Sequence, residues 1–116
     1  MSYQHVLDDL VRAVDASGAL LLDAEGEVVM EGGARDERHR LIGAYQGLAL
    51  EAIRKTVDRH GGGDIAYLLY RYTDGVVILR PLKDGYYLVL ALPVDGRVGE
   101  GLHHSRCAQE NLNREL

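Results

Sequence analysis

The chain has 116 residues, of which 47% are hydrophobic and 27% are charged, and its formal net charge is -5. This composition is typical of one globular domain over residues 1–116, and a domain of this size can leave an apolar face for self-association. The acidic balance argues against a nucleic-acid-binding protein, which usually carries a clustered basic face.

The chain is predicted to begin with an amphipathic helix over residues 2–15. Ser2 can cap its start, and Gly18 is placed to stop it. A β-hairpin with strands at residues 19–23 and 27–31 should follow, because Gly26 supplies the positive φ that such a turn needs. The glycines after residue 31 are expected to end this unit. The apolar positions of the helix recur at helical spacing and are Tyr3, Val6, Leu7, Leu10, Val11 and Val14.

A long middle helix is predicted over residues 36–60, where three glycines in a row break it. One broad apolar stripe suits a helix that lies on a sheet: Leu41, Ile42, Tyr45, Leu48, Ala49, Ala52, Ile53 and Thr56. Gly43 and Gly47 fall on the opposite side with Leu50 and Arg54, beyond the reach of that stripe. These two glycines are either simply tolerated on a solvated face, or they allow the backbone of a second subunit or of a docked partner to come close to the helix.

Strands are predicted at residues 65–72, 76–82 and 86–92, joined by turns that contain Asp-Gly. Their nearly continuous apolar runs predict a meander that is covered by helices on both faces. In the first of these strands Ile65, Tyr67, Leu69 and Arg71 should point to one side. Neither side is polar, so this strand at an edge of the sheet would be an exposed apolar edge, which a second subunit could pair.

The last helix is predicted over residues 98–115 and is the weakest of the three. Ser105 and Gln109 interrupt its apolar stripe of Val98, Leu102, Leu112 and Leu116. We therefore expect its end to fray or to depend on neighbouring elements for order.

No group of residues predicts catalysis, a cofactor or a metal site. The histidines lack zinc-ligand spacing, and the triple glycine follows a helix instead of leading into one, so it is not a phosphate loop. A single cysteine, Cys107, cannot form an internal disulfide, and a bystander role fits it better than a reactive one. No apolar run is long enough to cross a bilayer, and no secretion signal follows Met1, so a cytoplasmic location is expected.

The order helix, strand, strand, helix, strand, strand, strand, helix, with the phrase Leu-Leu-Leu-Asp-Ala-Glu-Gly-Glu-Val-Val in the first hairpin, resembles the roadblock and dynein light chain family, including its bacterial GTPase-regulator branch. The resemblance implies an α/β fold: one five-stranded antiparallel sheet with the middle helix on one face and the first and last helices on the other. It also implies dimers that join third strands edge to edge and set middle helices side by side. By that resemblance the middle-helix candidates for dimer or partner contact are Gly43, Gly47, Leu50, Glu51 and Arg54, and the edge-strand candidates are Ile65, Tyr67, Leu69 and Arg71.

The leading expectation is a non-enzymatic homodimer that binds a small Ras-like GTPase and regulates its nucleotide cycle or its position. Arg54 could supply a charge-stabilising arginine to that partner, although a surface arginine is more often only solvated. A small-ligand sensory module is an alternative that would need convergent polar groups in a pocket. An assembly subunit without a GTPase partner is a third hypothesis.

Overall fold

The computed structural model describes residues 2–33, 50–52, 54–55, 58–59, 61 and 65–116. Within these residues, 50–52, 54–55 and 58–59 are helical and belong to the predicted middle helix, whose other positions lie outside the described residues. The remaining elements, in chain order, are α1 (Tyr3–Val14), β1 (Gly18–Leu22), β2 (Val28–Gly33), β3 (Leu68–Tyr72), β4 (Gly75–Pro81), the short turn η1 (Lys83–Gly85), β5 (Tyr87–Pro93) and α3 (Val98–Glu115).

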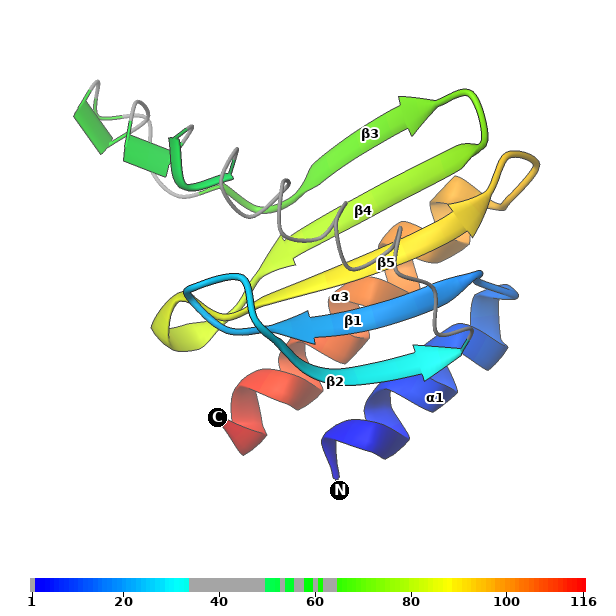
Figure 1. Ribbon diagram of the computed structural model, residues 1–116, viewed down its shortest axis with the longest axis horizontal. Helices are drawn as coiled ribbons and strands as arrows, with labels where there is room; N and C mark the ends of the chain where they lie inside the picture. The colour runs from blue at the N-terminus through cyan, green and yellow to red at the C-terminus, as the bar shows by residue number, and fades with distance from the viewer. Residues whose placement is uncertain (1, 34–49, 53, 56–57, 60, 62–64) are drawn as a thin grey trace.

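The strands form one five-stranded sheet in the order β2-β1-β5-β4-β3, and every neighbouring pair is antiparallel. The predicted meander of β3, β4 and β5 is therefore confirmed, and β5 joins it to the first hairpin (Figure 1). The outermost strands are β2 and β3. Glycines 32 and 33 were expected to end the hairpin, but both are part of β2. Gly32 packs closely against Leu7 of α1, since a Cβ added to Gly32 would lie 3.0 Å from Leu7 Cβ.

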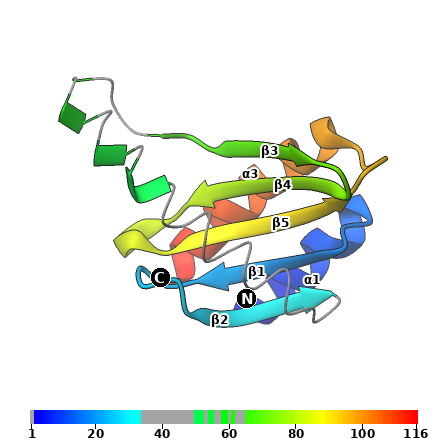
Figure 2. The ribbon, with the colours of Figure 1, turned by 45° about the horizontal axis from the view of Figure 1, so that its top comes forward.

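Each face of the sheet has its own hydrophobic core. α1 and α3 lie on the same face, as both views show (Figures 1 and 2). The core beneath them contains Val6, Leu7, Leu10, Val14, Ala19, Leu21, Val76, Ile78, Leu82, Leu88, Leu90, Leu92, Ala108 and Leu112. A second core on the other face contains Leu20, Leu22, Leu50, Val77, Leu79, Tyr87 and Val89. Alternation along β4 explains the division, because Val76 and Ile78 face one core while Val77 and Leu79 face the other.

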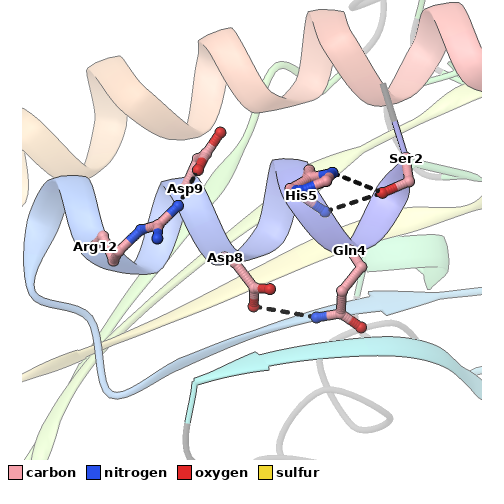
Figure 3. Close-up of polar contacts among 6 residues, drawn as sticks. All are labelled: Ser2, Gln4, His5, Asp8, Asp9 and Arg12. Carbon is pink, nitrogen blue, oxygen red and sulfur yellow. Dashed lines mark hydrogen bonds and ion pairs between the residues drawn. The ribbon is translucent and has the colours of Figure 1, made fainter.

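α1 begins where the sequence predicted and ends earlier. The Ser2 side chain accepts a hydrogen bond from the backbone N–H of His5, which satisfies one of the free donors at the helix start (Figure 3). The same figure shows the ion pair of Arg12 with Asp9 and the hydrogen bond from Gln4 to Asp8. Gly18 was expected to stop the helix, but Asp15 takes the left-handed conformation at φ 51° and ends it, which leaves Gly18 free to open β1.

α3 is better packed than its sequence suggested. Its buried residues are Gly101, Ser105, Ala108 and Leu112, which recur at helical spacing. Gly101 lies so close to the sheet that an added Cβ would be 2.9 Å from Leu92 Cδ1. The end of the helix is held by neighbours, since Tyr3 Oη donates to the Glu115 carbonyl oxygen at 2.9 Å and Asn113 Oδ1 accepts from the Lys83 backbone N–H at 2.9 Å. Among the described residues, no helix has the length and apolar character needed to cross a membrane.

Candidate interaction surfaces

β3 is an open edge of the sheet. Among the described strands it pairs with β4 alone, so its other side offers backbone N–H and C=O groups to a further strand. The side chains around it are large and exposed: Tyr67 is 42% exposed, Tyr72 is 40% exposed, and Arg71 is exposed as well. The expected apolar edge is thus present, and it is shorter than predicted because the strand begins at Leu68 instead of Ile65.

The side chains of β3 alternate between the two faces only within the strand itself. Leu69 packs against the core beneath α1 and α3, whereas Leu68 packs against the opposite core. Ile65 was expected to share a side with Leu69, but it packs with Leu68 on the other face. The period of two holds only for extended, paired backbone, and residues 65–67 lie before the strand, which accounts for the error.

The opposite edge, β2, is partly closed by the fold. Gln4 of α1 donates through Nε2 to the Glu31 backbone carbonyl oxygen at 2.8 Å, so a side chain already occupies one acceptor of this strand. The register between β1 and β2 also shifts at Leu21 and Leu22, which bends the hairpin. Bulges and charged residues are devices that keep an edge from pairing with another chain. β3 is therefore the more available of the two edges.

Arg80 is a buried cation that connects β4, α3 and the residues before β3. It is 6% exposed; its Nε donates to Ser105 Oγ at 2.8 Å and its Nη2 donates to the Leu102 carbonyl oxygen at 2.8 Å. Its Cζ also lies 5.0 Å from the ring centroid of Tyr67, a cation-π distance. Burial lowers the pKa of the Arg80 guanidinium from its ordinary value, although arginine keeps its charge in proteins.

The sequence analysis missed this cluster although it held two signals. Arg80 interrupts the apolar run of β4, and Ser105 interrupts the apolar stripe of α3. Only the interruption at Ser105 was noted, whereas the fold places Ser105 within hydrogen-bond distance of Arg80. A buried cation requires such acceptors, so the two irregularities explain each other.

The described part of the middle helix corrects the predicted side of Leu50. Leu50 is 3% exposed and packs in the second core, so the prediction that it lies on an outer interface is wrong. Ala52, which was assigned to the buried stripe, is exposed. Burying leucine is worth about 1.5–3 kcal/mol, more than alanine can gain, and this difference sets the rotation of the helix.

The other candidates on the middle helix are partly placed. Glu51 and Arg54 form an ion pair, with Arg54 Nη1 3.4 Å from Glu51 Oε2, and their side chains are 54% and 25% exposed. Gly43 and Gly47 lie outside the described residues. The structure thus places a charged pair near the surface of this helix, and whether the pair contacts a partner stays a prediction.

A groove of about 200 Å³ lies between α1 and α3. Its lining residues are Val6, Asp9, Leu10, Ala13, His104, Cys107, Ala108 and Asn111. Cys107 is exposed, and its neighbours from the two helices are mostly apolar. The described residues contain no group of three or more histidine, cysteine, aspartate or glutamate side chains arranged to hold a metal ion.

Known proteins share this arrangement of elements. The sequence profile of the Roadblock/LC7 domain matches residues 3–92. The solved structure of MglB from Myxococcus xanthus matches with a TM-score of 0.86 at 13% identity, covering 97% of this chain and 92% of that one. A structure described as MglB with a tetrameric arrangement matches with a TM-score of 0.84 at 19% identity, covering 95% and 84%. A Roadblock/LC7 domain from Streptomyces avermitilis matches with a TM-score of 0.82 at 16% identity, covering 97% and 95%. No curated protein sequence matches this chain.

Proposed function

This chain belongs to the Roadblock/LC7 domain family, and from that membership we propose that it is a non-catalytic homodimer that binds a small Ras-like GTPase and modulates its nucleotide cycle or its localisation. The observation that carries the proposal is the open, apolar edge strand β3, which offers a place for a second subunit. The choice of a GTPase as partner comes from the resemblance of the sequence to the GTPase-regulator branch of this family, and the MglB structures support the fold.

Pairing of β3 with the same strand of a second copy would satisfy the backbone groups of both edges. Two antiparallel copies related by a twofold axis bury the same residues on each side, and Tyr67 and Tyr72 are amphipathic side chains suited to such an interface. The tetrameric arrangement described for one MglB structure supports self-association in this fold. The dimer would extend the sheet continuously across both subunits.

The GTPase would dock on the face that carries the middle helix. Glu51 and Arg54, which form an ion pair on that helix, would contact the partner. Gly43 and Gly47 of the same helix would contribute to the same surface. Leu50 is not part of this surface, because it is buried in the monomer. The effect on the partner would come from shaping its switch loops, since hydrolysis or exchange on such GTPases depends on how these loops are ordered.

The dimer is tested by comparing the two sheet edges. Tyr72→Glu places a charge on β3, and Val29→Glu places one on β2, at positions that are 40% and 42% exposed respectively. Light scattering should give the mass of a dimer for the wild type and for Val29→Glu. Tyr72→Glu should show a concentration-dependent shift towards monomer, because each copy then brings a charge to the paired edge. A monomeric wild type, or equal behaviour of the two variants, contradicts the proposed edge.

The GTPase partner is tested with a Ras-like GTPase encoded beside this chain. Calorimetric titration with its GDP-bound and GTP-analogue-bound forms should show binding that favours one nucleotide state, and Arg54→Ala should weaken it. Arg114→Ala serves as a control on α3, on the opposite face of the sheet. If neither nucleotide state binds while the protein remains dimeric, an assembly role without a GTPase becomes the better explanation.

A further inference from the structure

The flank of β3 on the side of α3 is an uncovered, basic surface. α3 packs on β4 and β5, and Figure 1 shows β3 lying to one side of it. Leu69 is consequently only half-buried, and Tyr67 keeps 42% of its surface exposed although its ring rests on Arg80. An apolar strip therefore continues from the core to the solvent along this side of the strand.

Arginines surround the strip. Arg71 is two residues after Leu69 in the same strand, so it lies on the same face. Arg106 directly follows Ser105, the α3 residue that accepts a hydrogen bond from Arg80, and 73% of its side chain is exposed. The described residues give Arg106 one weak ion pair, with Nε 3.9 Å from Glu110 Oε1.

The buried arginine adds to this local charge. A guanidinium has five N–H donors, and hydrogen bonds to described residues take two of those of Arg80, to Ser105 and to Leu102. Within the part of the chain that the structure describes, no carboxylate forms an ion pair with Arg80. A chain with a net charge of -5 thus carries an arginine-rich patch around Tyr67 and Leu69.

We propose that this flank, formed by Tyr67, Leu69, Arg71 and Arg106 over the buried Arg80, is a docking surface for an acidic amphipathic segment of a partner protein. Apolar side chains of the segment would cover Leu69 and the exposed side of Tyr67, and its carboxylates would pair with Arg71 and Arg106. The surface is on the α3 face of the sheet, so strand pairing at the β3 edge would leave Leu69, Arg71 and Arg106 open, and the two proposals share only Tyr67. The proposed GTPase would dock on the opposite face, which carries the middle helix, so the inference does not depend on that partner.

The probes are designed peptides that differ only in charge. One amphipathic helical peptide carries leucines on one face with glutamates beside them, and its twin carries lysines in place of the glutamates. Fluorescence anisotropy should show submillimolar binding of the glutamate peptide, which weakens as salt rises from about 0.05 to about 0.5 M because screening shortens the reach of the arginine charges. Its lysine twin should bind at least about tenfold more weakly.

Two variants with equally exposed side chains locate the binding. Arg106→Glu should weaken binding of the glutamate peptide by about threefold to thirtyfold, because a rim attraction becomes a repulsion. Arg12→Glu on α1 is the matched control, since the side chains of Arg12 and Arg106 are both 73% exposed, and it should bind the peptide as the wild type does. Arg71→Glu should act like Arg106→Glu.

Several outcomes would overturn the inference. These are equal binding of the two peptides, no detectable binding of the glutamate peptide at about 1 mM, or the same affinity in Arg106→Glu and wild type. Arginine-dependent binding of a single-stranded oligonucleotide that is tighter than that of the peptide would assign the patch to nucleic acid instead. Light scattering on Arg106→Glu separates the docking surface from the proposed β3 dimer. The mass of this variant in solution should equal that of the wild type, while its affinity for the glutamate peptide falls.

Discussion

Replacing Ser105 with alanine should destabilise the protein chiefly through its effect on Arg80. Ser105 Oγ accepts from Arg80 Nε at 2.8 Å and donates to the Leu102 carbonyl oxygen at 3.1 Å, and Ser105 and Arg80 are both buried. Without the hydroxyl, a buried donor of a charged group loses its acceptor. The expected loss in the free energy of unfolding is about 1.5–3 kcal/mol.

The same change should cost less when Arg80 is absent. In Arg80→Met the serine keeps its hydrogen bond to Leu102, and methionine can fill much of the volume beneath α3. Ser105→Ala in this background removes one neutral hydrogen bond, which is worth about 0.5–1.5 kcal/mol. The two substitutions should therefore couple by about 1 kcal/mol or more.

Urea unfolding of the wild type, the two single variants and the double variant measures this coupling. All four proteins should be compared at one protein concentration, because self-association would raise the apparent stability of any dimeric species. If Ser105→Ala costs the same with and without Arg80, the hydroxyl does not serve the guanidinium and the reasoning fails.

Further predictions concern the second core, the end of α1 and the alkaline limb of stability. Leu50→Ala should lower the free energy of unfolding by about 2–5 kcal/mol, whereas Glu51→Ala at an exposed position should change it by less than about 0.5 kcal/mol; equal effects in urea unfolding would contradict the burial of Leu50. Asp15→Gly should raise stability by about 0.5–1 kcal/mol, since glycine adopts the left-handed conformation that Asp15 holds at φ 51° without strain, and a lower melting temperature would contradict this. Burial, with a smaller contribution from Asp23, raises the pKa of Tyr87 above its ordinary 10.0. Stability linked to Tyr87 is thus complete below pH 10.0 and is lost as the pH rises through the raised value, so Tyr87→Phe should lose less stability than wild type between neutral and alkaline pH, and parallel curves would refute the linkage.

Turn chemistry made the order of elements predictable. Gly26 and Gly85 have positive φ, as does Asp84, so the turn signals at residues 24–26 and 83–85 correspond to backbone that favours those residues. The alternating and continuous apolar runs between the turns then gave the strands, and their buried faces fixed the meander. Local rules were sufficient here because each connection is short.

The middle helix shows where such rules stop. Leu50 and Ala52 lie about 200° apart on a helix, so a broad apolar stripe can be drawn through either one. Which of them is buried depends on the sheet, where Leu20, Leu22 and Leu79 form the surface that receives Leu50. Sequence periodicity identified the helix, but only the partner surface decides its rotation.

The buried face of α3 was missed for a related reason. Its stripe contains Gly101, Ser105 and Ala108, which are small residues that carry little hydrophobic signal. They are buried because the helix lies close to the sheet, as the approach of Gly101 to Leu92 shows. The Arg80 cluster was missed as well, because its two signals, Arg80 and Ser105, are 25 residues apart in the chain and only the fold brings them together.

The two edge strands, β2 and β3, are not equally open to pairing with another chain, and this difference limits the assemblies that the sheet can form. If both edges of the sheet could pair, each subunit could recruit another without limit and the assembly would grow as an open fibre. The Gln4 side chain and the strand irregularity at Leu22 make pairing at β2 costly, whereas β3 has neither. Pairing through β3 alone closes after one addition, because a twofold axis uses that edge in both subunits. An assembly larger than a dimer would then have to form through faces of the sheet, where the helices and the arginine-rich flank lie.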